Sequence, residues 1–291
     1  MHPVFRALAS VLLLSAACAA QHPSFDVASI RPSPPGTRNK GMELLSPFTG
    51  GAPKGGLFSA NAPLSVYIIF AYHITDSSQY RPLFASLPAW AQSGTYDIEA
   101  RIDGTPDTDQ VRAMVRSLLE ERFKLATHLD TRPQPVYALV FDKPGHPGPQ
   151  LHPHPVSSAC TERPIGTSPA AIPTSAPAAT CGTALYQHDG RLHVRMIDES
   201  IEQAAISIGG AAGFMGGMES RSVVNQTGLT GQFDLDIEFA PETPVGPGAP
   251  VESTGLTFED ALKSQLGLKL VKQTGTVSTL VVDHIEKPSE N

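Results

Sequence analysis

Two short segments, far apart in the chain, alternate between apolar and acidic side chains. The first runs from Tyr96 to Ala100, and the second, Phe233 to Ile237, repeats its pattern. Side chains two residues apart lie on the same face of a strand, so this period predicts strands with one buried and one wet face. We therefore expect a sheet in each half of the chain.

A helix is predicted after each of these strands, because apolar residues recur there at helical spacing. They are Val111, Met114, Val115, Leu118, Leu119 and Phe123 in the first half, and Phe258, Ala261, Leu262 and Leu266 in the second. Asp107 and Gln110 have the spacing of a capping box at the start of the first helix. Thr257 is placed to cap the second helix, which we expect to end at Gly267 in the left-handed conformation.

Other elements recur in the same order. An earlier helix is predicted after Asn61-Ala62-Pro63, and its counterpart begins at Asp198 and stops at Gly209. After its second helix each half has a short strand, at 123–125 and 268–270, and then a last strand, at 136–144 and 279–288. The predicted fold is therefore α+β, with two tandem duplicated lobes. In each lobe two helices cover one face of a small mixed sheet, in the order β-α-β-α-β-β.

The stretch between the halves is dense in Pro, Ala, Ser and Thr and shows no apolar periodicity, which is typical of a linker. The expected organisation is a signal peptide at 1–20, a first lobe at 21–142, a Pro-rich linker at 143–185 and a second lobe at 186–291. Phe25–Ile30 is a spare strand, expected to cap a sheet edge or to pair between the lobes.

The N-terminus has the features of a secretory leader. Arg6 precedes an apolar run from Ala7 to about Ala17, too short to span a bilayer, and small residues follow. We expect cleavage after Ala20, with lipidation of Cys18 as the alternative. No later stretch approaches the roughly 18 apolar residues of a membrane helix. The sequence thus predicts an exported protein, periplasmic or secreted, without a transmembrane segment.

Two cysteines, Cys160 and Cys181, remain after cleavage. An isolated even pair in an oxidising compartment predicts a disulfide, and closing a loop of this size stabilises by roughly 3 kcal/mol in the chain-entropy model. Neither cysteine has a close Cys neighbour of the kind that zinc sites use.

The charge balance, 21 basic against 28 acidic residues, gives a net charge of -7. An acidic chain without a basic stripe lacks the electrostatic footprint of a phosphate-backbone binder, so we expect no nucleic acid partner. No Gly-x-Ser-x-Gly, His-Glu-x-x-His or Ser-x-x-Lys motif is present, which favours a protein that is not an enzyme and needs no cofactor.

Histidines in the linker are the candidate metal ligands. His146, His152 and His154 lie close together, and His188 and His193 follow. Imidazoles at this density can bind zinc, copper or nickel, and the alternative is a solvated Pro/His loop.

Three further features are structural or interface candidates. Residues 209–218 are Gly-rich and predict a flexible loop in which Phe214 and Met215 are candidate interface residues. Thr227-Gly228-Leu229-Thr230-Gly231 predicts a tight turn that needs positive φ and places Leu229 in the core. Trp90, before the first alternating strand, is a core residue or an interface anchor.

The chain resembles a family of uncharacterised exported proteins abundant in acidobacteria and associated with soil. The segments that carry the resemblance are FDVASIRPS, LPAWAQSGTYDIEA, VRSLLEERFKLATHLDTRPQPVYALVF, NQTGLTGQFDLDIEF and LTFEDALKSQLGLKLVKQTG, which together cover nearly all of the chain after the leader. Asn225-Gln226 stands where the family usually has Asp-Lys. The resemblance implies export and fold but assigns no catalytic residue.

Each half also resembles, more faintly, the short N-terminal domain of secretins and TonB-dependent receptors, which is a periplasmic signalling or assembly module. The function we expect is a non-enzymatic module of the cell envelope that binds a protein or peptide, since exposed strand edges in small sheets can accept a further strand. The alternatives are a metal-binding or metal-dependent hydrolytic protein that uses the linker histidines, and a sensor domain for a membrane-bound regulator.

Overall fold

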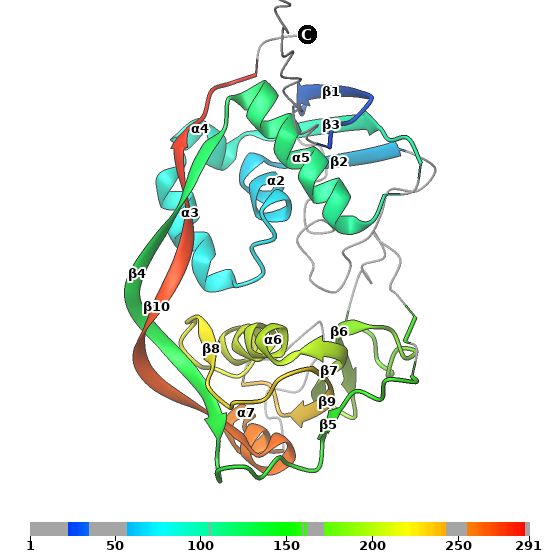
Figure 1. The fold of residues 1–291 in the computed structure, drawn as a ribbon, viewed down its shortest axis with the longest axis vertical. Coiled ribbons are helices and arrows are strands. Elements are labelled where there is room, and N and C mark those ends of the chain that lie inside the picture. Colours follow the sequence, from blue (N-terminus) through cyan, green and yellow to red (C-terminus); the bar gives the residue numbers. More distant parts are fainter. Residues whose placement is uncertain are drawn as a thin grey trace, which may run out of the picture.

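The computed structural model describes residues 23–34, 57–104, 106–158, 160–161, 172–242 and 255–288. Within these ranges the strands form three sheets accompanied by helices, which confirms the predicted α+β class. Two lobes lie at opposite ends of a long two-stranded ribbon (Figure 1). The predicted leader and Cys18 lie outside the described residues.

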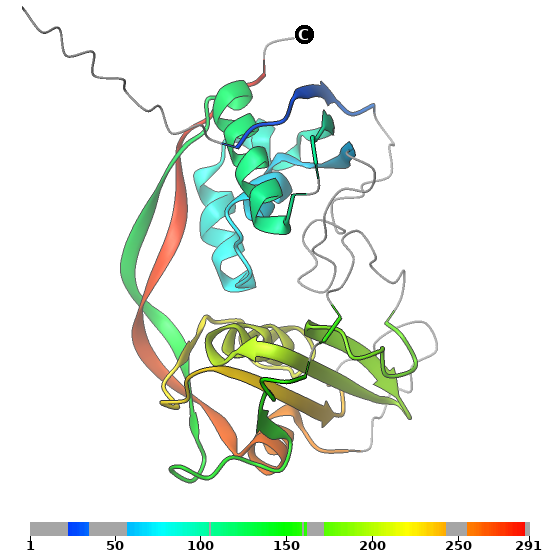
Figure 2. The same ribbon diagram turned by 45° about the vertical axis from the view of Figure 1, so that its right-hand side comes forward.

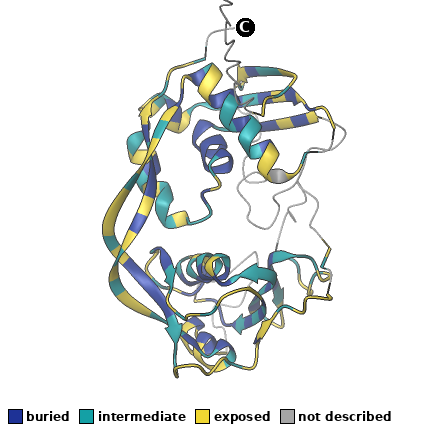
Figure 3. Cartoon of the chain, viewed as in Figure 1, coloured by how far each residue is buried: buried dark blue, intermediate teal, exposed yellow. Residues whose placement is uncertain are grey.

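The first lobe is built on a three-stranded antiparallel sheet with the order β1-β3-β2. Its elements are β1 (Val27–Pro32), β2 (Leu57–Pro63), α2 (Leu64–Ala71), η2 (Ser77–Gln79), α3 (Tyr80–Ser86), α4 (Ala89–Ser93), β3 (Thr95–Arg101) and α5 (Thr108–Phe123). α2 is buried along its whole length (Figure 3) and packs against α5. Both bonds of the predicted capping box join Asp107 and Gln110, which confirms the predicted start of α5. The predicted spare strand is β1, an edge strand of this sheet.

The second lobe has a four-stranded antiparallel sheet with the order β5-β9-β7-β6. Its elements are β5 (Leu151–Pro153), β6 (Gly182–His188), β7 (Arg191–Ser200), α6 (Ile201–Phe214), β8 (Val223–Asn225), β9 (Gln232–Phe239), α7 (Phe258–Ala261) and η3 (Leu262–Leu266). Burial alternates along β9 as its sequence predicts, with the apolar residues inside. Thr257 caps α7, and Gly267 ends η3 in the left-handed conformation, as predicted.

A ribbon of β4 (Ala126–Phe141) and β10 (Leu268–His284) connects the lobes. The two strands pair antiparallel over their whole length, with a bulge near the end of β10, and coil around each other (Figure 2). The prediction of two separate strands after each helix is therefore wrong, because each helix is followed by one continuous strand.

Each ribbon strand begins beside one lobe and ends in the core of the other. Tyr137 and Leu139, from the end of β4, belong to the core of the second lobe. Leu280 and Val282, from the end of β10, belong to the core of the first. The two halves of the chain therefore exchange their final strands, and neither core is complete with its own half alone.

Corresponding elements of the two halves have the same pairing register. Pro63 pairs with Thr95 immediately before α2 begins, and Ser200 pairs with Gln232 immediately before α6 begins. The helices that precede the ribbon strands both end in the left-handed conformation, at Lys124 and at Gly267. These matches support the internal duplication predicted from sequence, which remains a proposal.

Part of the predicted linker is folded. Within 143–185, β5 pairs with β9, and Leu151 of β5 is buried in the core of the second lobe. The apolar pattern of β5 is too short to predict a strand, since only one of its three side chains is buried. The division of the chain into lobes at 21–142 and 186–291 remains a prediction.

The prediction that α6 stops at Gly209 is also wrong, because the helix continues to Phe214. A Cβ atom on Gly209 would lie 2.6 Å from Cγ2 of Val223. Glycine at this position therefore allows β8 to pack closely against α6, and most of the predicted flexible loop is helix. No helix among the described residues is long and apolar enough to cross a membrane.

Candidate functional site

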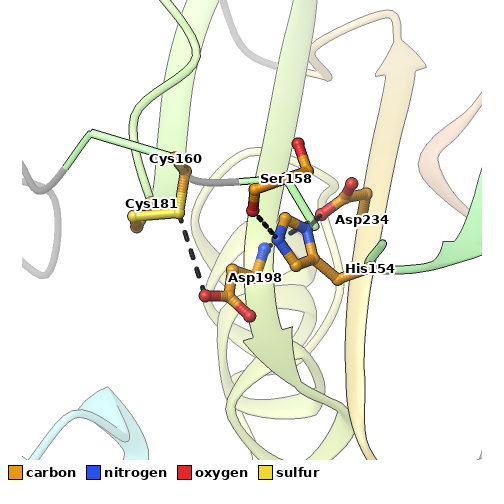
Figure 4. Close-up of a disulfide and its surroundings, with 6 residues drawn as sticks. All are labelled: His154, Ser158, Cys160, Cys181, Asp198 and Asp234. Atoms are coloured by element: carbon orange, nitrogen blue, oxygen red, sulfur yellow. Dashed lines mark hydrogen bonds and ion pairs between the residues drawn. A yellow bond between two sulfur atoms is a disulfide. The ribbon is translucent and has the colours of Figure 1, made fainter. Parts of the chain in front are cut away.

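Cys160 and Cys181 form the predicted disulfide. The Cα atoms are 5.1 Å apart, within the normal range for a disulfide. Cys160 follows β5, and Cys181 directly precedes β6, so the bond ties together two segments at the edges of the second sheet. A carboxylate oxygen of Asp198 lies 3.8 Å from the Cys160 sulfur (Figure 4). A disulfide sulfur has no proton to donate, so this is a contact and not a strong bond.

His154 is fixed by both ring nitrogens. Nδ1 lies 2.7 Å from a carboxylate oxygen of Asp234, and Nε2 lies 2.9 Å from the carbonyl oxygen of Ser158. The backbone N–H of Asp198 donates to the same Asp234 oxygen. Figure 4 shows the His154 ring between Ser158 and Asp234, with Asp198 between this ring and the disulfide. We call His154, Ser158, Asp198 and Asp234 the His154 cluster; it joins the segment after β5 to β9 and β7.

The first lobe has an equivalent cluster without a histidine. Asp97 occupies in β3 the place of Asp234 in β9, and its Oδ1 accepts hydrogen bonds from Ser33 Oγ, at 2.9 Å, and from Asn61 Nδ2. Ser33 follows β1 as His154 follows β5. The carboxylate therefore connects three strands in both lobes, but only the second lobe uses a group that titrates near neutral pH.

Two groups beside the disulfide have shifted pKa values. The hydrogen bond to Asp234 raises the pKa of His154 above its usual 6.5. Burial raises the pKa of Glu199 from 4.5 to about 7. The Glu199 carboxyl lies next to Asp198 in the chain and accepts a 3.4 Å hydrogen bond from Thr183. In the folded protein, therefore, each of these two side chains holds its proton to a higher pH than it would in water.

The histidines proposed as metal ligands do not converge in the part of the chain that the structure describes. His146 is exposed and bonds to the carbonyl of Pro144, and His152 is exposed on β5. His154 has both nitrogens engaged. The described residues contain one cluster with metal-ligand spacing, Cys160, Cys181 and Asp198. Its two sulfurs are bonded to each other, so they are not the thiolates that bind metal ions.

A network of charged and aromatic side chains covers the face of the second sheet between β6 and β9. Asp236 accepts hydrogen bonds from Arg195, at 2.9 Å, and from Tyr186, at 3.2 Å. The ring of His193 stacks on Tyr186 with 4.5 Å between centroids, and Glu238 pairs with Arg191. Of these residues, the sequence singled out only His193, as a candidate metal ligand. The acidic positions of β9 predicted that this face of the sheet is in contact with water, but not the network itself. Two ion pairs, Arg191–Glu238 and Arg195–Asp236, therefore cross this face of the sheet.

The candidate interface residues differ in exposure. Phe214, the last residue of α6, is 88% exposed, whereas Met215 is buried. Trp90 is half-buried against the first core, and the Lys287 ammonium lies 6.0 Å from its ring centroid. In the predicted turn, Gly228 and Gly231 both have positive φ. The N–H of Leu229 bonds to Thr227 Oγ1, and the Leu229 side chain packs against the second core.

The ribbon has two outer edges, and β4 presents the first. In an antiparallel pair, successive residues point their backbone N–H and C=O groups alternately toward the partner strand and away from it. The N–H of Tyr137 donates to Ser222, on the side away from β10, so odd-numbered residues of β4 point outward. Pro133 and Pro135 are therefore at outward positions, and each lacks the N–H that would otherwise be offered at the middle of this edge.

The outer edge of β10 keeps its donors. Thr276 pairs with Pro133 and Thr274 with Pro135, so the even-numbered residues of β10 also point outward. The N–H of Val282 confirms this direction, because it donates outward to Ser86 Oγ. Between Lys272 and Ser278 no described residue pairs with this edge. This stretch has exposed backbone donors and acceptors and no proline.

Where β5 ends, the edge of β9 is closed by a side chain. Gln265 accepts a hydrogen bond from the N–H of Glu238 in β9 and donates one to the carbonyl oxygen of Glu238, at 2.9 and 2.7 Å. An amide side chain thus satisfies the edge of β9 as a neighbouring strand would. Proline on β4 and glutamine beside β9 both limit the addition of a further strand. The middle of β10 has neither feature, so its outer edge differs from these two in being open to a further strand.

Comparison with known families gives a match over most of the chain. Residues 65–285 match a family model described as "Protein of unknown function (DUF3738)". Neither a curated protein nor a solved structure matches the chain.

Proposed function

The chain belongs to the DUF3738 family of proteins of unknown function, and from the geometry of its ribbon we propose that it is a protein-recognition module. It binds an extended segment of another polypeptide, which adds as a strand to the outer edge of β10. In this mode the backbone hydrogen bonds supply affinity, and the alternating side chains supply specificity.

The observation that carries the proposal is the difference between the two edges of the ribbon. Pro133 and Pro135 block strand addition to β4, whereas Lys272, Thr274, Thr276 and Ser278 present outward backbone groups on β10. All four of these β10 residues are exposed. A bound strand would also extend a sheet that has only two strands in this region, and such ribbons are marginally stable alone.

Export to the cell envelope is part of the proposal. The predicted leader at 1–20 supports it, and so does the disulfide, since disulfides persist in oxidising compartments. We propose a periplasmic or secreted location and an envelope protein or exported peptide as the binding partner.

Replacing one outward residue by proline tests this mode of binding. Thr276→Pro removes an N–H that points away from β4, so it leaves the internal ladder intact. Thr276→Val removes the hydroxyl group and keeps the N–H.

Binding of a random peptide library and of cell-envelope extracts is measured for three forms: the original chain, Thr276→Val and Thr276→Pro. We expect the original chain and Thr276→Val to select the same binders and Thr276→Pro to lose them while keeping its melting temperature within a few degrees. Equal binding by Thr276→Pro and Thr276→Val would contradict strand addition at this edge.

A further inference from the structure

The outer edge of β10 has a sequence that can pair with itself. Its outward positions are arranged symmetrically about Gly275, with Thr274 and Thr276 on either side and Lys272 and Ser278 beyond them. If two copies of β10 pair antiparallel about this centre, Thr274 of one copy faces Thr276 of the other. Lys272 then faces Ser278, so the two lysines do not oppose each other.

We propose that a second copy of this chain occupies the edge, through β10–β10 pairing centred on Gly275. The inference rests on the proposed function in that the same edge accepts a strand, and a second copy and a segment of another polypeptide compete for it. Four facing pairs contribute about eight backbone hydrogen bonds, since each outward residue donates one and accepts one. Threonine pairs across antiparallel strands add a favourable contact between their side chains.

The blocked edge of β4 explains why this association would stop at two copies. In the middle of the ribbon, beyond the reach of β8, self-pairing of β10 gives four strands in the order β4-β10-β10-β4, with a β4 strand at each margin. Both margins then carry Pro133 and Pro135 at outward positions, so a further chain meets no donor at these two positions, opposite Thr276 and Thr274. An edge that pairs with its own copy across a two-fold axis forms a closed dimer, whereas two open edges would lead to fibres.

The surroundings of the edge leave the central stretch accessible. α3 packs beside the far end of β10, where Ser86 accepts from Val282, and the core of the second lobe receives Leu268 at the other end. The residues between Lys272 and Ser278 lie between these two covered ends. Gly275 itself is required within the ribbon, because a Cβ atom there would lie 2.7 Å from Val136.

Sedimentation equilibrium of the chain without its leader tests the proposal. We expect a reversible monomer–dimer equilibrium for the original chain and for Thr276→Val. Thr276→Pro should weaken the association by about 10- to 50-fold, since each dimer loses two N–H donors and each is worth roughly a factor of five. Thr274→Pro serves as a second variant if Thr276→Pro does not fold.

Cysteine cross-linking tests the register independently of the proline variants. An equal mixture of Thr274→Cys and Thr276→Cys chains should form an intermolecular disulfide faster than either chain alone, because these two positions face each other across the interface. A monomer at every concentration, or a dimer insensitive to proline with no preference for the mixed pair, would overturn the proposal. A monomeric chain that still captures a peptide in a Thr276→Pro-sensitive manner would overturn the dimer alone and leave the proposed function standing.

Discussion

Asp97 and Asp234 occupy equivalent places in the two lobes. Each lies on an inner strand of its sheet, and its carboxylate accepts hydrogen bonds from the segments on both sides of that strand. Asp97 bonds to Ser33 and Asn61, whereas Asp234 bonds to His154 and to the backbone of Asp198. The two sites share the placement of the carboxylate, but only the second contains a histidine, a side chain that changes its charge near neutral pH. The first lobe therefore provides a built-in control for the second.

Stability should fall with rising pH through the His154 cluster. The folded-state pKa of His154 lies above its unfolded value of 6.5, so the folded protein binds the proton more tightly. The stabilisation is complete below pH 6.5 and is lost as pH rises through the folded pKa. We expect His154→Ala to lower the melting temperature at pH 6, and the melting temperature of this variant to fall less between pH 6 and 8 than that of the original chain. Ser33→Ala should lower the melting temperature by the same amount at pH 6 and at pH 8.

Glu199 should act in the same direction over a different range. Its pKa rises from 4.5 to about 7 on folding, so stability falls as pH increases from 4.5 to 7 and is constant above that. Glu199→Gln keeps the acceptor for Thr183 and removes the charge. We expect a gain of roughly 1 to 3 kcal/mol in unfolding free energy at pH 8 and little change at pH 4.5. Urea unfolding of both chains at the two pH values measures this difference in free energy. An equal difference at pH 4.5 and pH 8 would contradict a raised pKa of Glu199.

The disulfide should contribute substantially to stability. It joins residues separated by 21 positions, and closing such a loop stabilises by roughly 3 kcal/mol in the chain-entropy model. The double substitution Cys160→Ser, Cys181→Ser is expected to lower the unfolding free energy in urea by about that amount. Addition of a thiol reductant should change the original chain in the same way and leave the variant unaffected.

Adjacent glycines in α6 should respond oppositely to alanine. At Gly209 a Cβ would meet Val223 at 2.6 Å, so Gly209→Ala should destabilise by about 1 to 3 kcal/mol. At Gly210 a Cβ would meet no atom within 4 Å, so Gly210→Ala should stabilise by roughly 0.5 to 1 kcal/mol through helix propensity. Thermal unfolding of the two variants measures the difference, and two changes of the same sign would refute the close packing of β8 on α6.

Local patterns were sufficient for the elements with strong periodicity. The alternation at 233–237 predicted β9, and the spacing of Asp107 and Gln110 predicted the start of α5. The end of α6 was mispredicted because Gly209 signals a helix end locally, while its role is to make room for Val223, a tertiary contact.

Pairings over long distances were beyond the reach of sequence patterns. Periodicity identifies strands but not their partners, so the ladder between β4 and β10 and the exchange of strands between the lobes were not predicted. His154 was singled out by its neighbours, but Asp234 is 80 residues away, and only the fold brings them together. The Pro133-x-Pro135 spacing was a visible signal of a blocked edge, since two prolines two residues apart in a strand point the same way.

Amide hydrogen exchange along β10 tests the central claim, that its outer edge is open and accepts a strand. In the dilute chain, the amides of Thr274 and Thr276 should exchange rapidly, whereas those of Gln273 and Gly275, which point toward β4, should be protected. Addition of a selected peptide, or a concentration at which dimers form, should slow exchange at Thr274 and Thr276 and leave Gln273 unchanged. Protection of Thr274 and Thr276 already in the dilute chain, or no change on association, would contradict the account.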